Sequence, residues 1–297
     1  MNKVISPQIK TNNLSIIFNK NKQNQFTLLS KLNLHFSSNK IYFIVGNSGV
    51  GKTTLINHFN GLLKSNDGDI FIEDIAILGK NRKIKNVKKL RKLISIVFQF
   101  PEYQLFKSTV EDDIIFGPLN FGLKKIEAKK LAKFYLNMVG LDDTFLQSCP
   151  FNLSGGQKRR VAIAGILAIE PKIIIFDEPT AGLDPKGEEK IIEIIEKLKN
   201  DGKTVIVISH TMDLALKIAD EILLIDKKTI TFSGEPYALF TNDQLLVTTN
   251  IVKPKIIQII DCLVHHDKNF ASLYSLQPKT IKELAKAIND ILVGRSR

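Results

Sequence analysis

The sequence predicts an α/β fold in which helices flank a parallel sheet, and three observations carry this prediction. Three short apolar runs rich in β-branched residues are separated by stretches with helical spacing. A glycine-rich loop directly follows the first run, and two acidic residues directly follow the second. Because ligands of open α/β sheets bind at the carboxyl ends of the strands, these polar groups are expected to meet at one edge of the sheet.

The apolar runs are residues 41–45, 173–176 and 204–208. None of them alternates with polar residues, so each is predicted to be a strand buried on both faces. One helix is expected after residue 54 and another from Asp184-Pro185 to Asp201-Gly202, where a proline at the first position and a glycine after the end are typical boundaries. Their apolar faces comprise Leu55, Phe59, Leu62 and Leu63 in the first, and Ile191, Ile192, Ile195 and Leu198 in the second.

The rest of the chain divides by pattern. Residues 109–150 lack a comparable strand run and are predicted to be a mostly helical insertion. After about Gly234 the α/β pattern fades into a mostly helical tail. Its last helix is signalled by Thr280 and Glu283 in a capping-box spacing, with an apolar stripe of Ile281, Leu284, Ala285 and Ile288. That stripe either packs on its own domain or forms an interaction surface.

Composition excludes several classes of protein. The chain has 297 residues, of which 44% are apolar and 24% charged, as in ordinary folded proteins. Its apolar stretches are too short to cross a bilayer, the first residues lack the apolar core of an export signal, and Cys149 and Cys262 are the only cysteines. The cytosol is the default compartment. The net charge of +12 fits nucleic acid, an anionic membrane or a nucleotide, and the basic run 80–92 is expected to be a solvated helix face or connector.

The glycine-rich loop matches the phosphate-binding pattern G-x-x-x-x-G-K-[ST] between a strand and a helix. Its amides and the following helix N-terminus are suited to hold phosphate oxygens. Lys52 is expected to contact the β- and γ-phosphates, and the Thr53 hydroxyl to contact Mg²⁺. The loop and first helical residues are Gly46, Asn47, Ser48, Gly49, Val50, Gly51, Lys52, Thr53 and Thr54.

The strand at 173–176 leads into Asp177-Glu178, and the strand at 204–208 leads into Ser209-His210. Asp177 is predicted to support the metal ion, and Glu178 to orient or deprotonate the attacking water. The alternative for the two acids is a cap on the turn before Pro179. His210 is expected at the same edge of the sheet.

A second helix start suited to an anion follows the helical insertion. Ser154 is a natural N-cap, and the glycines after it leave backbone amides uncovered. The segment reads L-S-G-G-Q and contains Ser154, Gly155, Gly156 and Gln157.

With these motifs in this order, residues 12–235 resemble an ATP-binding-cassette ATPase. The resemblance implies a RecA-like P-loop NTPase core with a helical subdomain, and ATP and Mg²⁺ as cofactors. It implies a cassette domain over 1–235, a helical subdomain over about 109–165, and a small C-terminal extension over 236–297. The family pattern assigns catalytic roles to Lys52, Glu178 and His210, and a link to Mg²⁺, water and a transmembrane partner to Gln99. Residues Ser154 to Gln157 would face ATP on the opposite subunit, Asp184 would lie between subunits, and Phe18 is the candidate for adenine stacking, with a core position as its alternative.

Residues 98–122 and 150–165 are similar to the ATPases of energy-coupling factor (ECF) transporters, of the second of two ATPase types. This implies an enzyme that hydrolyses ATP to drive import of a vitamin or transition-metal ion. The implied partners are a second cassette ATPase, which pairs through the C-terminal extension, a transmembrane coupling protein and a substrate-binding membrane subunit. The implied location is the cytoplasmic face of the cell membrane, where the basic surface meets anionic lipid. No nucleic acid is expected. The alternatives are another importer or exporter ATPase, or a soluble cassette protein acting on nucleic acid or ribosomes.

Overall fold

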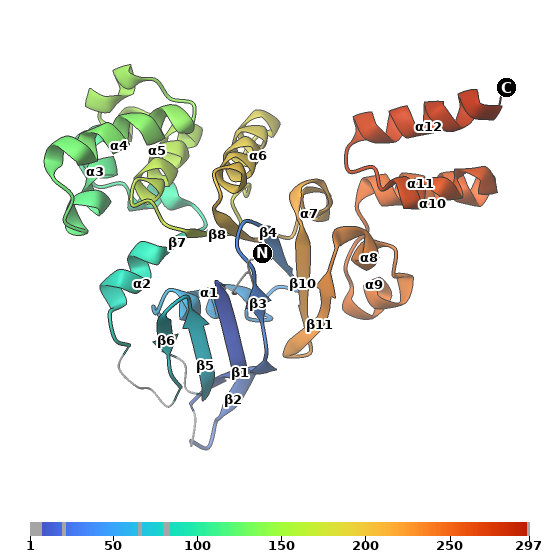
Figure 1. Cartoon of the computed structure of the whole chain (residues 1–297), viewed down its shortest axis with the longest axis horizontal. Coiled ribbons are helices and arrows are strands. Elements are labelled where there is room, and N and C mark those ends of the chain that lie inside the picture. Colours follow the sequence, from blue (N-terminus) through green and yellow to red (C-terminus); the bar gives the residue numbers. More distant parts are fainter. Residues whose placement is uncertain (1–7, 20–21, 65–66, 80–83, 296–297) are drawn as a thin grey trace, which may run out of the picture.

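The computed structural model describes residues 8–19, 22–64, 67–79 and 84–295. It contains two sheets and a set of helices, with the helical subdomain and the C-terminal helices on opposite sides of the central sheet (Figure 1). The basic run predicted at 80–92 is described only from residue 84 onward, where α2 (Val87–Leu93) presents exposed lysine and arginine side chains. That part confirms the solvated helix face, and residues 80–83 lie outside the described residues.

The central sheet has six strands in the order β11-β10-β4-β9-β8-β7. All neighbours are parallel except β10 and β11. The three predicted strands are found as β4, β9 and β8, and every residue in them is buried. The bounds are β4 (Ile41–Val45), β7 (Ile94–Val97), β8 (Ile173–Asp177), β9 (Thr204–Ile208), β10 (Glu221–Asp226) and β11 (Thr229–Gly234).

A second, antiparallel sheet packs beside the first and was not anticipated from the sequence. Its order is β2-β1-β5-β6, with β3 also paired to β1. The helix α1 (Lys52–Phe59) lies between the two sheets, since its buried Leu55, Ile56 and Phe59 contact both. The strands are β1 (Ile9–Phe18), β2 (Phe26–Leu32), β3 (His35–Phe36), β5 (Asp67–Ile72) and β6 (Ile75–Ile77).

The first helix is shorter than predicted. It ends at Phe59, because Gly61 adopts a positive φ of 64° that breaks the helical path. Leu62 and Leu63 therefore lie beyond the helix and are exposed by 47% and 38%. The expectation that they share its buried face is wrong.

Alternate side chains of the central strands fill two cores. Tyr42 and Ile44 point toward α1 and the antiparallel sheet, whereas Ile41, Phe43 and Val45 point toward the other helices. That second core includes α6 (Pro185–Asn200), α7 (Met212–Ile218) and the predicted helical insertion. Within residues 109–150 the predicted insertion contains α3 (Val110–Asn120), α4 (Lys125–Met138) and a 3₁₀ turn at Asp143–Gln147. The helices continue beyond it through a 3₁₀ turn at Pro150–Asn152 into α5 (Gly155–Leu167).

After β11 the described chain is helical, and it forms the arm on the right of Figure 1. The last helix, α12, begins at Ile281 after the predicted Thr280 cap, whose Oγ1 accepts from the Glu283 N–H at 3.2 Å. The Glu283 carboxylate accepts from the N–H of Lys279 at 2.7 Å. The elements are α8 (Pro236–Phe240), α9 (Asp243–Thr249), α10 (Lys255–His266), a 3₁₀ turn at Lys268–Ala271, α11 (Ser272–Leu276) and α12 (Ile281–Arg295).

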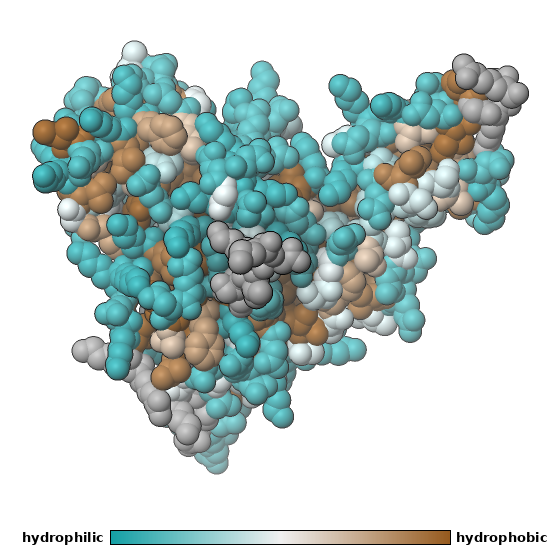
Figure 2. Space-filling view, in the orientation of Figure 1, coloured by the Kyte–Doolittle hydropathy of each residue, from teal (hydrophilic) through white to brown (hydrophobic). Residues whose placement is uncertain are grey.

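The apolar stripe of α12 differs from the predicted one. Leu284 is buried, and Ala287, Ile288 and Ile291 pack against the core, while Ile281 and Ala285 are exposed. Because an α-helix has 3.6 residues per turn, residues 284, 287, 288 and 291 lie on one face of α12, and this face makes the contact. This stripe lies against the other helices of the arm, where Figure 2 shows apolar side chains gathered.

Candidate functional site

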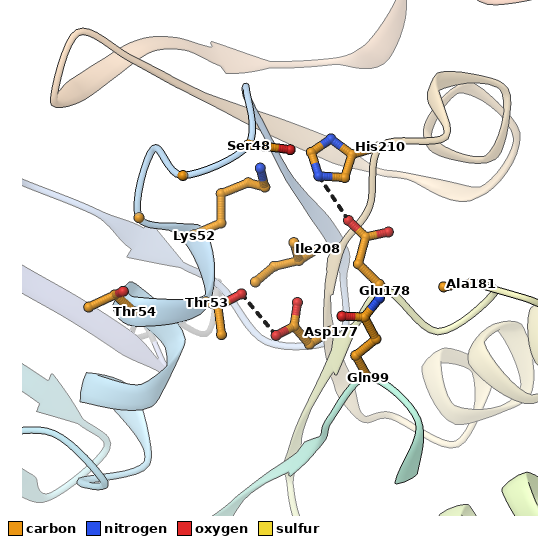
Figure 3. Close-up of a pocket in the computed structure, with 12 residues that line it drawn as sticks. Ser48, Lys52, Thr53, Thr54, Gln99, Asp177, Glu178, Ala181, Ile208 and His210 are labelled. Atoms are coloured by element: carbon orange, nitrogen blue, oxygen red, sulfur yellow. Dashed lines mark hydrogen bonds and ion pairs between the residues drawn. The ribbon is translucent and has the colours of Figure 1, made fainter. Parts of the chain in front are cut away.

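An open pocket of about 570 Å³ lies at the carboxyl edge of the central sheet. Segments that are far apart in the sequence line it, as predicted from the positions of the motifs after the strands. Figure 3 shows the side chains of Lys52, Thr53, Gln99, Asp177, Glu178 and His210 turned toward this space. Its lining residues are Ser48, Gly49, Gly51, Lys52, Thr53, Thr54, Gln99, Asp177, Glu178, Ala181, Ile208 and His210.

The phosphate-binding loop takes a path that requires glycine. Gly46, Gly49 and Gly51 have φ values of 145°, 78° and 107°. A side chain at Gly46 would place Cβ 2.3 Å from the carbonyl oxygen of Ile225, so the loop passes directly against β10. A side chain at Gly49 would meet open space, which leaves this part of the loop free to approach a ligand.

Lys52 starts α1 and folds back over the loop. Its ammonium donates to the carbonyl oxygens of Gly46 at 2.7 Å and Asn47 at 3.0 Å. Burial lowers the pKa of Lys52, against the opposing charges of Glu178 and Asp177. An ammonium held in this way is ready to exchange carbonyl partners for phosphate oxygens.

Thr53 and Asp177 form a pair of oxygen ligands. Thr53 Oγ1 donates to Asp177 Oδ2 at 3.0 Å, which joins α1 to the end of β8. Burial raises the pKa of Asp177, and the Thr53 hydroxyl and the Lys52 charge oppose that shift. The Gln99 side chain lines the same pocket from the segment after β7. Hydroxyl, carboxylate and amide oxygens are hard donors, which Mg²⁺ prefers.

Glu178 follows Asp177 in a left-handed backbone conformation, with φ of 49°. Its N–H donates to the carbonyl oxygen of Ile208 at 2.9 Å, which fixes the residue against the end of β9. Its Oε1 lies 3.2 Å from His210 Nε2, and among the described residues that oxygen has no hydrogen-bond partner of good geometry. Burial raises the pKa of Glu178, and burial together with the Lys52 charge lowers the pKa of His210. The raised pKa of Glu178 favours proton binding and the lowered pKa of His210 disfavours the imidazolium form, so this Glu178 oxygen is available to accept a proton.

The L-S-G-G-Q segment forms a complete capping box at the start of α5. Ser154 Oγ accepts from the Gln157 N–H at 3.3 Å, and Gln157 Oε1 accepts from the Ser154 N–H at 2.9 Å. Gly155 and Gly156 have open space where a side chain would lie. Ser154, Gly156 and Gln157 line a separate pocket together with Asp184, and none of residues 154–157 contributes to the pocket around Lys52.

Four other predicted residues, Phe18, Gly46, Asn47 and Val50, are not among the residues that line the pocket around Lys52. Phe18 ends β1 and is 44% exposed, so a core position for it is wrong. Asn47 turns its side-chain amide toward the C-terminal extension, where Nδ2 donates to the carbonyl oxygen of Thr249 at 3.3 Å.

Sequence reasoning missed a buried arginine that joins three functional segments. Arg159 lies in α5, two residues after Gln157, and its side chain is 4% exposed. It binds Glu102 with two nitrogens at 3.1 and 3.2 Å and donates to the carbonyl oxygen of Ala181 at 2.8 Å. It thereby links α5 with the segment after Gln99 and the segment after Glu178. The available signal was weak, because Arg159 stands in the polar first turns of α5 between Lys158 and Arg160.

A parallel sheet, a glycine loop on a helix N-terminus, paired acids at the end of β8 and a helical subdomain define a P-loop NTPase of the ATP-binding-cassette class. The family model described as "ABC transporter" matches residues 29–181. A protein of Mycoplasmoides gallisepticum named "Energy-coupling factor transporter ATP-binding protein EcfA2" is 53% identical over 290 residues, which cover 96% of this chain and 91% of that protein. A protein of Mycoplasma pneumoniae with the same name is 50% identical over 96% of this chain and 94% of its own length.

Solved structures agree with this class. The structure of cbiO1 from Clostridium perfringens, described as part of the ABC transporter complex cbiONQ, is 32% identical with a TM-score of 0.71, covering 86% of this chain and 99% of that one. A dimeric ATP-binding cassette in a post-hydrolysis state with ADP and Pi is 30% identical with a TM-score of 0.67, covering 77% and 98%. The chain belongs to the ABC transporter family and, within it, to the ATP-binding proteins of energy-coupling factor transporters. Within the described residues, no helix is both long and apolar enough to span a membrane.

Proposed function

We propose that this chain is the ATP-hydrolysing, energy-coupling subunit of an ECF-type importer that takes up a vitamin or a transition-metal ion. One observation carries the proposal. Lys52, Thr53, Asp177, Glu178 and His210 converge on one open pocket, in a chain about half identical to ECF transporter ATPases.

The triphosphate of ATP binds along the loop 46–54, where backbone amides and the Lys52 ammonium meet its oxygens. Thr53, Asp177 and Gln99 supply the oxygen ligands for Mg²⁺, and the bound ion offsets the phosphate charge. Phe18, exposed at the end of β1, stacks on the adenine. The loop, its lysine and its glycines determine where the phosphates lie.

Glu178 is the general base that takes a proton from the attacking water. Its buried carboxylate has a raised pKa and an oxygen without a well-aligned partner, two properties that favour proton acceptance. His210, whose Nε2 lies 3.2 Å from this carboxylate, contacts the γ-phosphate. General-base catalysis of this kind contributes about 10²- to 10⁴-fold in rate.

A complete site requires a second cassette. Ser154, Gly156 and Gln157 line a different pocket from Lys52, so we infer that residues 154–157 meet ATP held by the partner ATPase. Asp184, beside them in that pocket, lies at the same junction. The C-terminal extension adds a pairing surface, whose exposed apolar side chains include Ile281 and Val293.

The transmembrane coupling protein docks on the groove that follows Gln99. Leu105, Phe106, Phe116 and Ile166 line this groove, and Phe106 and Phe116 meet edge to face at 4.9 Å. Tyr103 beside it is 85% exposed. This exposed aromatic groove directly follows the Gln99 segment in the chain. A movement of the membrane partner docked there would therefore shift Gln99 at the ATP site. Docking there places the chain peripherally on the cytoplasmic face of the membrane, with a substrate-binding subunit in the same complex.

The proposal is tested by purifying the tagged chain from detergent-solubilised membranes and identifying its companions by mass. A second cassette ATPase and polytopic membrane proteins are expected. The Tyr103→Asp variant should no longer co-purify with the membrane proteins but should still bind nucleotide.

Two variants test the ATP site. Glu178→Gln should bind ATP while releasing phosphate at least a hundredfold more slowly, and Lys52→Ala should bind ATP more weakly. Rapid turnover by Glu178→Gln, or recovery of ribosomes in place of membrane proteins, would contradict the proposal.

A further inference from the structure

The C-terminal extension touches the phosphate-binding loop directly. The Asn47 side chain, in the loop, donates to the backbone carbonyl of Thr249, the last residue of α9, at 3.3 Å. Thr249 is buried, and its hydroxyl donates to the carbonyl oxygen of Leu245 at 2.7 Å. The end of α9 therefore holds one side of the loop that faces the phosphates.

A second hydrogen bond leaves the same segment six residues later. The backbone N–H of Lys255, the first residue of α10, donates to Asp213 Oδ1 at 2.7 Å. Asp213 lies in the first turn of α7, three residues after His210. Residues 249–255, which we call the extension bridge, thus connect the loop on one side of the pocket with the His210 segment on the other.

The extension bridge is fixed at both ends. Asn250 ends α9 in a left-handed conformation, and the Ile251 N–H donates to the carbonyl oxygen of Leu246 at 3.1 Å. Lys253 Nζ lies 2.6 Å from Oδ1 of Asp243 in α9, and it also forms an ion pair with Asp261 in α10, so Lys253 connects the two helices. Because both ends are anchored in packed helices, the bridge resists any change in the separation between the loop and α7.

We propose that the extension bridge is a positioning element that holds the phosphate-binding loop and α7, which follows His210, at the separation required for ATP. This inference rests on the proposed ATP site and adds that the extension sets its affinity. By linkage, bound nucleotide stabilises the bridge to the same degree as the bridge stabilises bound nucleotide. Asn47 affects the bound nucleotide through the position of the phosphate-binding loop, and Asp213 affects it through the position of α7.

Lys255 offers a matched pair of variants in the full-length chain. Lys255→Pro removes the donated N–H, and the first position of a helix accepts proline. Pro254 before it already has φ of −55° and ψ of 147°, which a following proline requires. Lys255→Ala keeps the N–H and changes only an exposed side chain. Equilibrium binding of a fluorescent ATP analogue should weaken about threefold to tenfold in Lys255→Pro, the value of one net hydrogen bond, and stay unchanged in Lys255→Ala.

The other end of the bridge supplies an independent variant. Asn47→Ala removes the donor to Thr249 while the backbone carbonyl that receives Lys52 remains. It should weaken binding by a similar factor. Combined with Lys255→Pro, it should weaken binding by less than the product of the two effects, because one broken bond already releases the bridge.

Hydrogen exchange in the wild-type chain supplies the second measurement. A non-hydrolysable ATP analogue should slow exchange in a peptide spanning 243–255, and Asn47→Ala should abolish that slowing at saturating nucleotide. The proposed role of the bridge would be overturned if both Asn47→Ala and Lys255→Pro bound the analogue with wild-type affinity. It would also be overturned if the analogue left the exchange rate of that peptide unchanged. Failure of the ATP site itself would appear separately, as wild-type binding in Lys52→Ala.

Discussion

Two neighbouring carboxylates at the end of β8 face the same pocket with different partners. Asp177 Oδ2 accepts from the Thr53 hydroxyl, whereas Glu178 is held through its backbone N–H to Ile208 and its Oε1 lies 3.2 Å from His210 Nε2. Burial raises the pKa of both groups. The protein therefore keeps two carboxylates where their charge is unfavourable, which is typical of groups retained for chemistry.

The raised pKa of Glu178 predicts how its replacement affects stability. A group whose pKa is higher in the folded state stabilises the fold below its unfolded pKa of about 4.3, and this contribution is lost as the pH rises through the folded pKa. Glu178→Gln should therefore raise the melting temperature at pH 8, and the gain should disappear near pH 4. Circular dichroism melts at both pH values check this. The same change at the exposed Glu196 is the control, and an equal gain there, or at pH 4, would contradict the assignment.

Replacement of Arg159, in contrast to that of Glu178, should lower the stability of the fold. Arg159→Met leaves the Glu102 carboxylate, which is 17% exposed, without its cation. Breaking such a pair from one side costs about 3 to 5 kcal/mol of unfolding free energy. Urea denaturation should show this loss, and adding Glu102→Gln should recover part of it. A single variant as stable as the wild type would contradict the role of Arg159 as a link between segments.

At the scale of elements, Asp184 has two candidate roles, as the N-cap of α6 and as a residue at the junction between cassettes. Asp184 Oδ1 accepts from the Gly187 N–H at 2.9 Å, and Pro185 occupies the first helical position. Asp184→Ala should cost about 1 kcal/mol of stability, whereas Asp184→Asn keeps a capping oxygen and should cost little. ATPase assays then distinguish the roles. A loss of turnover in the stable Asp184→Asn variant supports a role at the junction between cassettes, and wild-type turnover leaves Asp184 as a cap alone.

The observed stripe of α12 also yields a prediction. Leu284 is 3% exposed, so Leu284→Ala should lower the free energy of unfolding by about 2 to 3 kcal/mol. Ile281, which is 61% exposed, should tolerate Ile281→Ala without measurable cost. Denaturant titrations of the two variants compare the stripe seen in the structure with the one predicted from sequence. Equal losses would contradict the packing of α12.

At the scale of the whole molecule, the pocket around Lys52 and the pocket at Ser154 are separate in one chain. Hydrolysis should therefore require two cassettes. The specific activity of the chain should rise with protein concentration or with added second ATPase, and its dependence on ATP should be cooperative. Phosphate-release assays across a dilution series check this. Constant specific activity down to nanomolar chain would contradict a shared site.

Local sequence patterns were sufficient to predict the structure wherever a motif directly follows a strand with an unbroken apolar run. Buried strands read as unbroken apolar runs, and the loop at 46–54 and the acids at 177–178 follow two of them, so β4, β8 and the pocket edge were predicted correctly. The antiparallel sheet was missed, because its strands mix buried and exposed residues and because the pairing of β1 with both β2 and β5 contains register shifts. The helix end at Phe59 was missed because apolar Leu62 and Leu63 continue the spacing after the chain has turned.

The sequence alone determined the class of protein, the order of its motifs and the chemistry of its pocket, because glycines, a lysine, a threonine and paired acids in fixed spacing serve few other purposes. Tertiary structure decided which groups act on one another. The contact of Glu178 with His210, the buried link from Arg159 to Glu102 and the bond from Asn47 to Thr249 join residues 32, 57 and 202 positions apart. Such pairs form only when separate elements pack together, so no local pattern in the chain announces them.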